Sequence, residues 1–391
     1  SNGLNVGKDF SFGKETKITA SDASTNGWFG QSCAIDGNYV IIGTNRTEDH
    51  GPWTGSAYIF NATTGAQIYK LLPTDIASDD EFGISVAISG NYAIIGSKHD
   101  DDAGNSSGSA YIFNVTTGTQ LHKLTASDAA AGDYFGGFGC VAIDGNYAIV
   151  GATNNDDNGT SSGSAYIFNV TTGTQLHKLT ASDAAASDSF GGSVAISGNY
   201  AIIGAKNDDD DGEGSGSAYI FNVTTGTQLH KLTANDGAVG DYFGKAVDIH
   251  GNYAIVGANG DDDNGESSGS AYIFNVTTGT QLHKLTASDG AASDSFGNAV
   301  DIHGNYAIVG AYADDDNGYN SGSAYIFDLV TGKEIKKITA SDSQVDDKFG
   351  NAVAISDNYA VVGMQMDDDH GTDSGSAYIF GPTEDSLLKI T

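Results

Sequence analysis

Positive charge and proline are scarce in this chain of 391 residues. It contains 17 Lys and Arg residues against 50 Asp and Glu, which gives a formal net charge of −33, and only three prolines. Such an acidic surface repels nucleic-acid phosphates and anionic membranes, so neither is expected as a partner. Divalent cations are the partners that it would attract. The 54 glycines indicate a chain that turns every few residues.

Cysteine and long apolar segments are also nearly absent. Cys33 and Cys140 are the only cysteines, and they lie in non-neighbouring copies of the repeat described below, so buried free thiols are expected rather than a disulfide. No apolar run approaches the roughly 18 residues that a membrane span needs, and direct membrane insertion is not expected. No signal peptide is visible, although a mature secreted chain would have lost it.

A repeat of about 53 residues fills the chain from about Asp22 to Phe380. The Tyr of an Ala-Tyr-Ile-Phe motif recurs at Tyr58, Tyr111, Tyr166, Tyr219, Tyr272, Tyr325 and Tyr378. Its spacing is regular except where an extra Gly-Phe stands near Phe138. A fixed period of this size indicates a solenoid, a propeller or an array. No linker interrupts the seven copies, which predicts one domain over residues 1–391.

Each copy holds four short strand signals, for example residues 191–196, 199–204, 216–221 and 228–233. The second and third are almost entirely apolar, which requires that both faces of the sheet be covered. We therefore predict an all-β fold, a seven-bladed β-propeller of four-stranded antiparallel blades. A flat β-solenoid is the competing interpretation. Residues 14–20 resemble a fourth strand and are favoured to complete the seventh blade, although residues 387–391 resemble it too.

Alternating strand directions place the four connections of each copy on two faces. The Asp-rich loop between strands two and three shares one face with the crossover to the next copy. The tight Gly-Asn turns and the Asn-Val-Thr-Thr-Gly tips share the other. One face is therefore predicted to be strongly acidic and the other nearly neutral.

The Asp-rich loops are the candidate metal sites. In an extended loop the first and third acids point the same way, and calcium binds 6–8 oxygens at about 2.3–2.6 Å. Crossover carboxylates such as Asp128, Asp183, Asp236 and Asp289 could add ligands. The alternative is a solvated acidic surface in which Asp forms turns. We predict several Ca²⁺ ions, held by Asp100, Asp102, Asp157, Asp208, Asp210, Asp261, Asp263, Asp314, Asp316, Asp367 and Asp369.

Phe-Gly at the start of each copy, Gly-Ala after the second strand, and Gly-Ser-Ala-Tyr-Ile-Phe after that resemble the FG-GAP repeat of integrin α-subunit β-propellers. They resemble more closely the variant FG-GAP repeats of secreted and surface proteins of microbes and algae. The resemblance implies a propeller and an extracellular setting, but fold does not fix function. Integrin-type repeats carry their calcium loop between strands one and two. This chain has a tight turn there, so those calcium roles are not transferred.

Two further groups of residues are candidate sites. Trp28, Trp53 and Arg46 belong to the first copy, whose Asp triplet is degraded, and an exposed Trp pair can stack on a sugar ring. The alternative is that the tryptophans fill space left by the irregular repeat. The tips carry Asn-x-Thr sequons, which are glycosylation acceptors if the chain is eukaryotic and secreted, and otherwise plain turn residues. These sequon residues are Asn114, Asn169, Asn222 and Asn275.

No catalytic motif is present, whether a Gly-x-Ser-x-Gly elbow, a His-Glu-x-x-His helix or a phosphate loop. Repetition also makes the acidic pairs equivalent, whereas an active site needs environments that move pKa values apart. We therefore predict a non-enzymatic, secreted or cell-surface module for calcium-dependent adhesion or structural interaction, with a protein or glycan partner. The alternatives are a lectin with its site at blade one, and a self-assembling subunit of an extracellular filament or sheath.

Overall fold

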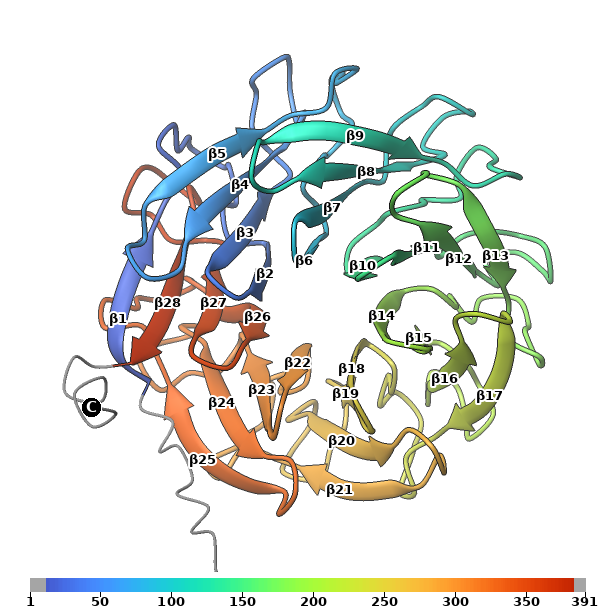
Figure 1. Cartoon of the computed structure of the whole chain (residues 1–391). Coiled ribbons are helices and arrows are strands. Elements are labelled where there is room, and N and C mark those ends of the chain that lie inside the picture. Colours follow the sequence, from blue (N-terminus) through green and yellow to red (C-terminus); the bar gives the residue numbers. More distant parts are fainter. Residues whose placement is uncertain (1–11, 383–391) are drawn as a thin grey trace, which may run out of the picture.

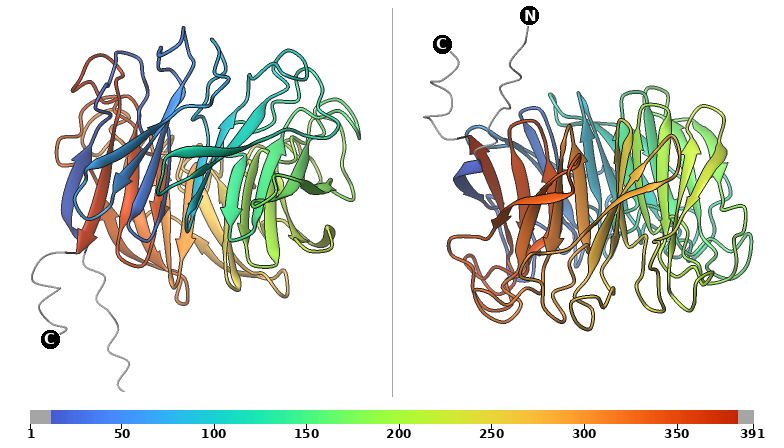
Figure 2. Two further views of the ribbon diagram at one scale, coloured as in Figure 1. Left: turned by 45° about the horizontal axis from the view of Figure 1, so that its top comes forward. Right: turned by 90° about the horizontal axis from the view of Figure 1, so that it is seen from below.

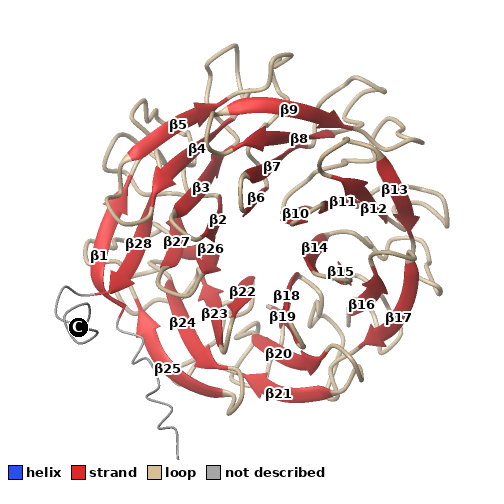
Figure 3. Cartoon of the chain, in the orientation of Figure 1, coloured by secondary structure: helices blue, strands red, loops and turns tan. Residues whose placement is uncertain are grey.

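The computed structural model describes residues 12–382, and in this range the chain forms β-strands and no helix (Figures 1 and 3). The strands make seven four-stranded antiparallel sheets arranged as blades around a central axis. This confirms the predicted seven-bladed β-propeller, and a flat solenoid is excluded. No helix among these residues is long and apolar enough to cross a membrane.

Each blade runs from an inner strand beside the axis to an outer strand at the rim. The inner strands are β2 (Ser32–Asp36), β6 (Val86–Ser89), β10 (Val141–Asp144), β14 (Ser193–Ser197), β18 (Ala246–His250), β22 (Ala299–His303) and β26 (Phe349–Ile355). The second strands are β3 (Tyr39–Thr44), β7 (Tyr92–Ser97), β11 (Tyr147–Ala152), β15 (Tyr200–Ala205), β19 (Tyr253–Ala258), β23 (Tyr306–Ala311) and β27 (Ala360–Met364). The third strands are β4 (Ser56–Asn61), β8 (Ser109–Asn114), β12 (Ser164–Asn169), β16 (Ser217–Asn222), β20 (Ser270–Asn275), β24 (Ser323–Asp328) and β28 (Ser376–Pro382). The outer strands are β5 (Gln67–Leu71), β9 (Thr119–Leu124), β13 (Gln175–Leu179), β17 (Thr227–Leu232), β21 (Gln281–Leu285), β25 (Lys333–Ile338) and β1 (Phe12–Ile18).

The N-terminal strand closes the ring. β1 pairs antiparallel with β28, with Glu15 opposite Phe380 and Ile18 opposite Ala377 (Figure 1). The prediction that the N-terminal segment completes blade seven is thus confirmed, with the strand at residues 12–18. The competing segment, 387–391, lies outside the described residues.

The aromatic residues of the repeat motifs pack between neighbouring blades. Phe243 contacts the rings of Tyr272 and Phe274 edge-on, with centroids 5.5 and 5.7 Å apart, and all three side chains are buried. The glycine after this Phe is required, because Gly244 has φ +90° and a Cβ there would lie 2.3 Å from the Ser217 carbonyl oxygen. The Phe-Gly and Tyr-Ile-Phe motifs are therefore two halves of one inter-blade contact.

Side chains of the third strands alternate between the two neighbouring cores. In β16, Tyr219 and Phe221 enter the core on one side of the blade, whereas Ala218 and Ile220 enter the core on the other. A strand covered on both faces needs no polar side, which is why this motif is apolar throughout.

The connections sort onto two faces as predicted (Figure 2). On one, which we call the loop face, each Asp-rich loop pairs with the next crossover, as where the Phe243 amide donates to the Ser215 carbonyl oxygen at 3.0 Å. On the other, the turn face, each tip contacts the Gly-Asn turn of its own blade, as where the Val223 amide donates to the Asn199 carbonyl oxygen at 2.9 Å.

If β1 holds the ring closed, shortening a buried side chain on it should destabilise the whole propeller. Ile18 is buried with Phe29 and Tyr58 in the core between blades seven and one. We expect Ile18→Ala to lower the free energy of unfolding by about 3 kcal/mol in denaturant titration, because it leaves a cavity. The exposed Lys14→Ala on the same strand is the control. Equal stability of the two variants would show that β1 does not carry the closure.

Candidate functional site

The acidic residues of each blade converge on a lysine of the outer strand. In blade five, Lys284 Nζ lies 2.8 Å from Asp236 of the crossover, 2.8 Å from Asp261 and 2.5 Å from Asp263 of the Asp-rich loop. Each Asp-Lys cluster, as we call this arrangement, joins three separate segments of the chain: crossover, loop and outer strand. The structure thus brings the predicted ligands together around a cation that the chain itself provides.

The cluster recurs in every blade with small changes. In blade one the lysine pairs with Asp22 and Asp49, and in blade three Asn155 stands in place of the first loop Asp, so that the lysine pairs with Asp128 and Asp157. Blade seven takes its lysine from the N-terminal strand that closes the ring. The seven lysines are Lys17, Lys70, Lys123, Lys178, Lys231, Lys284 and Lys337.

Where the first loop residue of a cluster is Asp, its carboxylate accepts several hydrogen bonds. Asp261 is only 3% exposed and accepts hydrogen bonds from the Tyr272 hydroxyl at 2.9 Å, the Ser270 hydroxyl at 3.0 Å and the Asp263 amide at 3.2 Å. Burial acts to raise the pKa of Asp261, but the hydrogen bonds from Lys284, Tyr272 and the Asp263 amide, together with the charge of Lys284, outweigh it and the pKa is lowered. The Tyr of the Tyr-Ile-Phe motif therefore also orients the acidic loop.

These clusters fit an oxygen-ligated cation only in part. In blades two, four and five, carboxylate oxygens from the crossover Asp and from the first and third loop Asp lie within 4.8 Å of one another. The same oxygens already contact the lysine ammonium, which would have to leave before calcium could gather its 6–8 oxygens. Sequence analysis missed the lysine, although the signal was present: in copies one to six a Lys stands in the fourth strand, 21 residues after the third acid of the loop.

A second group of crossover aspartates lies beneath the clusters and was also missed. Each side chain is only 4–6% exposed and accepts the backbone N–H of the residue three positions earlier, as Asp294 does from Ala291 at 2.7 Å. Burial and the neighbouring loop carboxylates raise the pKa of four of them, Asp80, Asp241, Asp294 and Asp347, to about 6. The whole group is Asp80, Asp133, Asp188, Asp241, Asp294 and Asp347.

The blade-one candidates form one stack on the loop face. The Arg46 guanidinium carbon lies 3.3 Å from the centre of the Trp28 ring and 5.4 Å from that of Trp53. Trp53 is 48% exposed, whereas one face of Trp28 is covered by the guanidinium. Nε1 of Trp28 and Nε of Arg46 have no hydrogen-bond partner among residues 12–382.

The sequon asparagines lie on the turn face, at the ends of the third strands. Asn222 accepts hydrogen bonds from the amides of Thr224 at 3.0 Å and Thr225 at 2.9 Å, and so shapes the tip. The cysteines are both free, as predicted, and Cys140 is the buried one.

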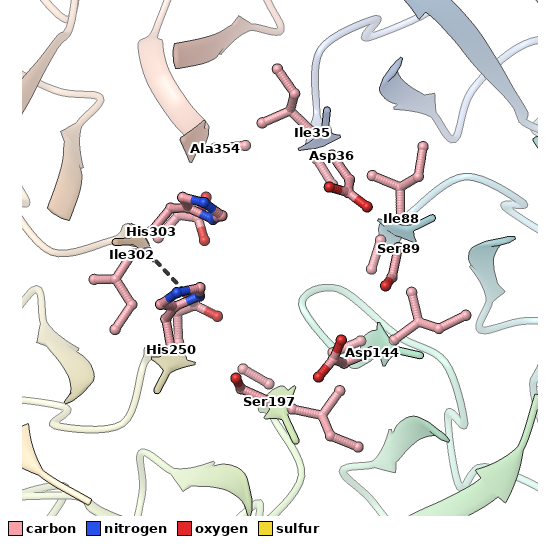
Figure 4. A pocket seen from close by; sticks show the side chains of 18 of the residues that line it. Ile35, Asp36, Ile88, Ser89, Asp144, Ser197, His250, Ile302, His303 and Ala354 are labelled. Atoms are coloured by element: carbon pink, nitrogen blue, oxygen red, sulfur yellow. Dashed lines mark hydrogen bonds between the residues drawn. The ribbon is translucent and has the colours of Figure 1, made fainter. Parts of the chain in front are cut away.

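The propeller axis is hollow, and its turn-face end is a cavity of about 440 Å³ ringed by the last residues of the inner strands. His250 and His303 lie side by side there, with ring centroids 4.6 Å apart, and Asp36 and Asp144 lie across the opening (Figure 4). Asp36 and Asp144 accept the backbone N–H of Gly90 and Gly198 in neighbouring blades, at 2.6 and 2.7 Å.

Two further aspartates of this cavity stand where the other five blades carry Ala. Asp248 and Asp301 hydrogen-bond to each other, and burial raises the pKa of both. Each also accepts an amide of the next blade, from Ile302 at 2.8 Å and Ile355 at 2.5 Å. The sequence signal was the change from Val-Ala-Ile to Val-Asp-Ile in two neighbouring copies.

Seven radial four-stranded sheets, with an Asp-rich loop above each, define the chain as a β-propeller with one acidic face. It belongs to the FG-GAP repeat family, whose model matches residues 12–60, 66–113, 119–168, 174–221, 227–274, 280–327 and 333–380. No curated protein matches the chain. Among solved structures, the chain is similar to the computationally designed Ika8 protein, with a TM-score of 0.52 and 15% identity over 94% of this chain and 99% of that one. That likeness shows the fold alone.

Because the pKa of the buried crossover aspartates is raised, we predict that the propeller is more stable in mild acid. Because the folded pKa of Asp294 is raised to about 6, its contribution to stability is present below the unfolded pKa of about 3.9 and is lost as pH rises through 6. The pKa of Asp289 in the same crossover is lowered, since the hydrogen bonds from Lys337 and Tyr325 outweigh its burial. Its contribution is present above pH 4. We therefore expect the melting temperature to be higher at pH 5 than at pH 7.5.

Two variants of that crossover separate this effect from general charge repulsion. Asp294→Asn should raise the melting temperature at pH 7.5 and raise it by less at pH 5. Asp289→Asn should lower it at pH 7.5. The explanation fails if both variants shift stability in the same direction at pH 7.5.

Proposed function

We propose that the chain is a non-enzymatic, secreted or surface-exposed interaction module that presents its loop face to a protein or glycan partner. An FG-GAP repeat propeller suggests an interaction or adhesion module. We choose the loop face because the exposed aromatic side chains lie on it. Among residues 12–382, those exposed by more than a third all belong to the loop face: Trp53, Phe138, Tyr242 and Tyr319. Aromatic residues are enriched at protein interfaces and carry much of their binding energy.

Backbone strain at the same face supports this proposal. In every copy the residue before the Phe-Gly motif has φ between 53° and 59°, where glycine would be the relaxed choice. The seven copies nevertheless place larger and different side chains there: Trp28, Glu81, Tyr134, Ser189, Tyr242, Ser295 and Lys348. A strained position that varies within a repeated frame is typical of a functional surface.

The positions of the sequons also favour the loop face as the face that binds a partner. Asn114, Asn169, Asn222 and Asn275 lie on the turn face, so N-glycans in a eukaryotic secreted chain would leave the loop face open. Self-assembly into a filament or sheath was inferred from residues 387–391, which lie outside the described residues, and it remains a prediction.

We propose further that calcium binds the Asp-Lys clusters only in competition with the lysine. The lysine already pairs with the carboxylates that calcium would use and offsets part of their charge. Removing it with Lys284→Met, which keeps the aliphatic stem, leaves Asp236, Asp261 and Asp263 without their counter-ion. We expect 5 mM calcium to change the melting temperature of the wild type by less than about 2 °C relative to EDTA, and to raise that of Lys284→Met by about 5 °C.

Lys333→Met is the matched control, because Lys333 lies on the exposed side of an outer strand and contacts no cluster. It should behave like the wild type. A large calcium-dependent rise in the wild type would show that the lysine does not prevent calcium from binding. No gain in Lys284→Met would show that the cluster does not take calcium at all.

A lectin site at blade one is the second candidate, favoured by the Trp28–Arg46–Trp53 stack with its exposed Trp53 ring. Sugars that stack on this ring should change tryptophan fluorescence, and Trp53→Ala should abolish the change. Trp28→Phe keeps an aromatic platform for Arg46 and should retain it. If no sugar on a broad panel alters the fluorescence, the stack serves only to pack blade one.

A further inference from the structure

Three lysines gather near the axis on the loop face, away from the Asp-Lys clusters. Lys98, Lys206 and Lys245 come from blades two, four and five, and all three act electrostatically on the buried Cys140 of blade three. Lys98 pairs with Glu81 at 2.9 Å. No carboxylate of residues 12–382 lies within 4 Å of the Nζ atoms of Lys206 and Lys245.

The irregular insertion of blade three lies at the same place. Gly137 and Phe138 are the extra residues of this copy, and they bring the Phe138 ring to within 5.7 Å of Lys245 Nζ. The Phe138 side chain is 39% exposed, and its carbonyl oxygen accepts the Cys140 thiol at 3.3 Å. Insertion and lysine therefore meet at the loop-face mouth of the axial channel.

Together they border a hollow of about 160 Å³, which has room for about five waters. Its rim is polar, with Lys245, Gln31 and Asn298, and one side is the Phe138 ring. Its floor is a ring of valines that also line the larger cavity beyond, including Val86, Val141 and Val194. The hollow thus has one positively charged edge and an apolar base.

One charged group of this hollow has no carboxylate partner. Burial and the nearby Lys206 lower the pKa of Lys245 to about 8, which reflects an ammonium that is partly desolvated and has no acid partner.

We propose that this hollow binds a carboxylate attached to a short apolar chain. The carboxylate would accept a hydrogen bond from Lys245, with Lys206 adding long-range attraction, while the apolar chain would rest against Phe138 and the valines. This proposal deepens the proposed function by naming a chemistry for its partner. It uses none of the residues that calcium or sugars would contact, so it can fail or succeed independently of them.

The test is acylation of the full-length protein at pH 7.5, with labelling of each lysine read by mass spectrometry. Butyrate is the probe. A lysine of lowered pKa is more nucleophilic at this pH, so Lys245 should be labelled faster than the seven lysines of the Asp-Lys clusters. Butyrate at about 10 mM should slow labelling of Lys245 at least about fivefold, as expected for a millimolar Kd, and leave Lys333 unaffected. Sodium chloride and butylamine at the same concentration should not protect it.

Two variants test butyrate binding with a measurement that does not depend on the reactivity of the lysine. Lys245→Asn gives blade five the residue that blades six and seven carry at the same position, Asn298 and Asn351, so the fold should accept it. Deleting Gly137 and Phe138 restores the length of the other copies. In saturation-transfer NMR, Lys245→Asn should lose butyrate binding, and the deletion should weaken it while retaining some affinity.

Protection by chloride equal to that by butyrate, or undiminished butyrate binding by Lys245→Asn, would overturn the proposal. So would labelling of Lys245 that 50 mM butyrate leaves unchanged. A short peptide with a free C-terminal carboxylate, compared with its amide, then identifies the source of the carboxylate. Protection by the free-acid peptide assigns the hollow to a chain terminus, and protection by butyrate alone assigns it to a small acid.

Discussion

Closure of the ring is the constraint on which the rest of the structure depends. A blade with apolar second and third strands is covered on both faces only when it has a neighbour on each side. Seven such blades satisfy this only as a complete circle. The chain meets the constraint by pairing β1 with β28, so that the last blade is held by the first strand. The same strand carries Lys17, which means that the backbone closure and the seventh Asp-Lys cluster form together.

The Asp-Lys clusters give each blade an internal cation. A loop with several adjacent carboxylates is unfavourable unless positive charge lies among them, and the lysine supplies it from a strand that is already ordered by the sheet. An ammonium on a tethered side chain does not depend on the calcium concentration around the protein. The position of the lysine also explains why the neighbouring Tyr hydroxyl and the crossover Asp recur in every copy. Both groups lie beside the lysine ammonium, where the Tyr hydroxyl donates a hydrogen bond and the crossover Asp accepts one.

Much of the fold followed from the sequence, because the fixed period, the apolar strands and the tight turns are local signals repeated seven times. The acidic residues at the site were also found, since Asp261 and Asp263 stand out by composition. Lys284 was not, because its contact with them depends on how the outer strand of one blade passes beside a loop 21 residues earlier. The raised pKa of Asp294 was equally out of reach, since it arises from burial beneath another loop rather than from its neighbours in the sequence.

Near-identical copies also make the departures between them informative. Framework positions repeat because each blade must fit the next, so a substitution there is retained only where it does not disturb that fit. Several of these departures lie along the axis. Asp248 and Asp301 lie at its turn-face end with His250 and His303, and the Phe138 insertion and Lys245 lie at its loop-face end. One end of the channel is therefore lined by carboxyl groups and the other by lysine, with a ring of valines between them. An axis polarised in this way follows from no requirement of the propeller fold, and it marks the channel as one part of this protein in which the copies have diverged in chemistry.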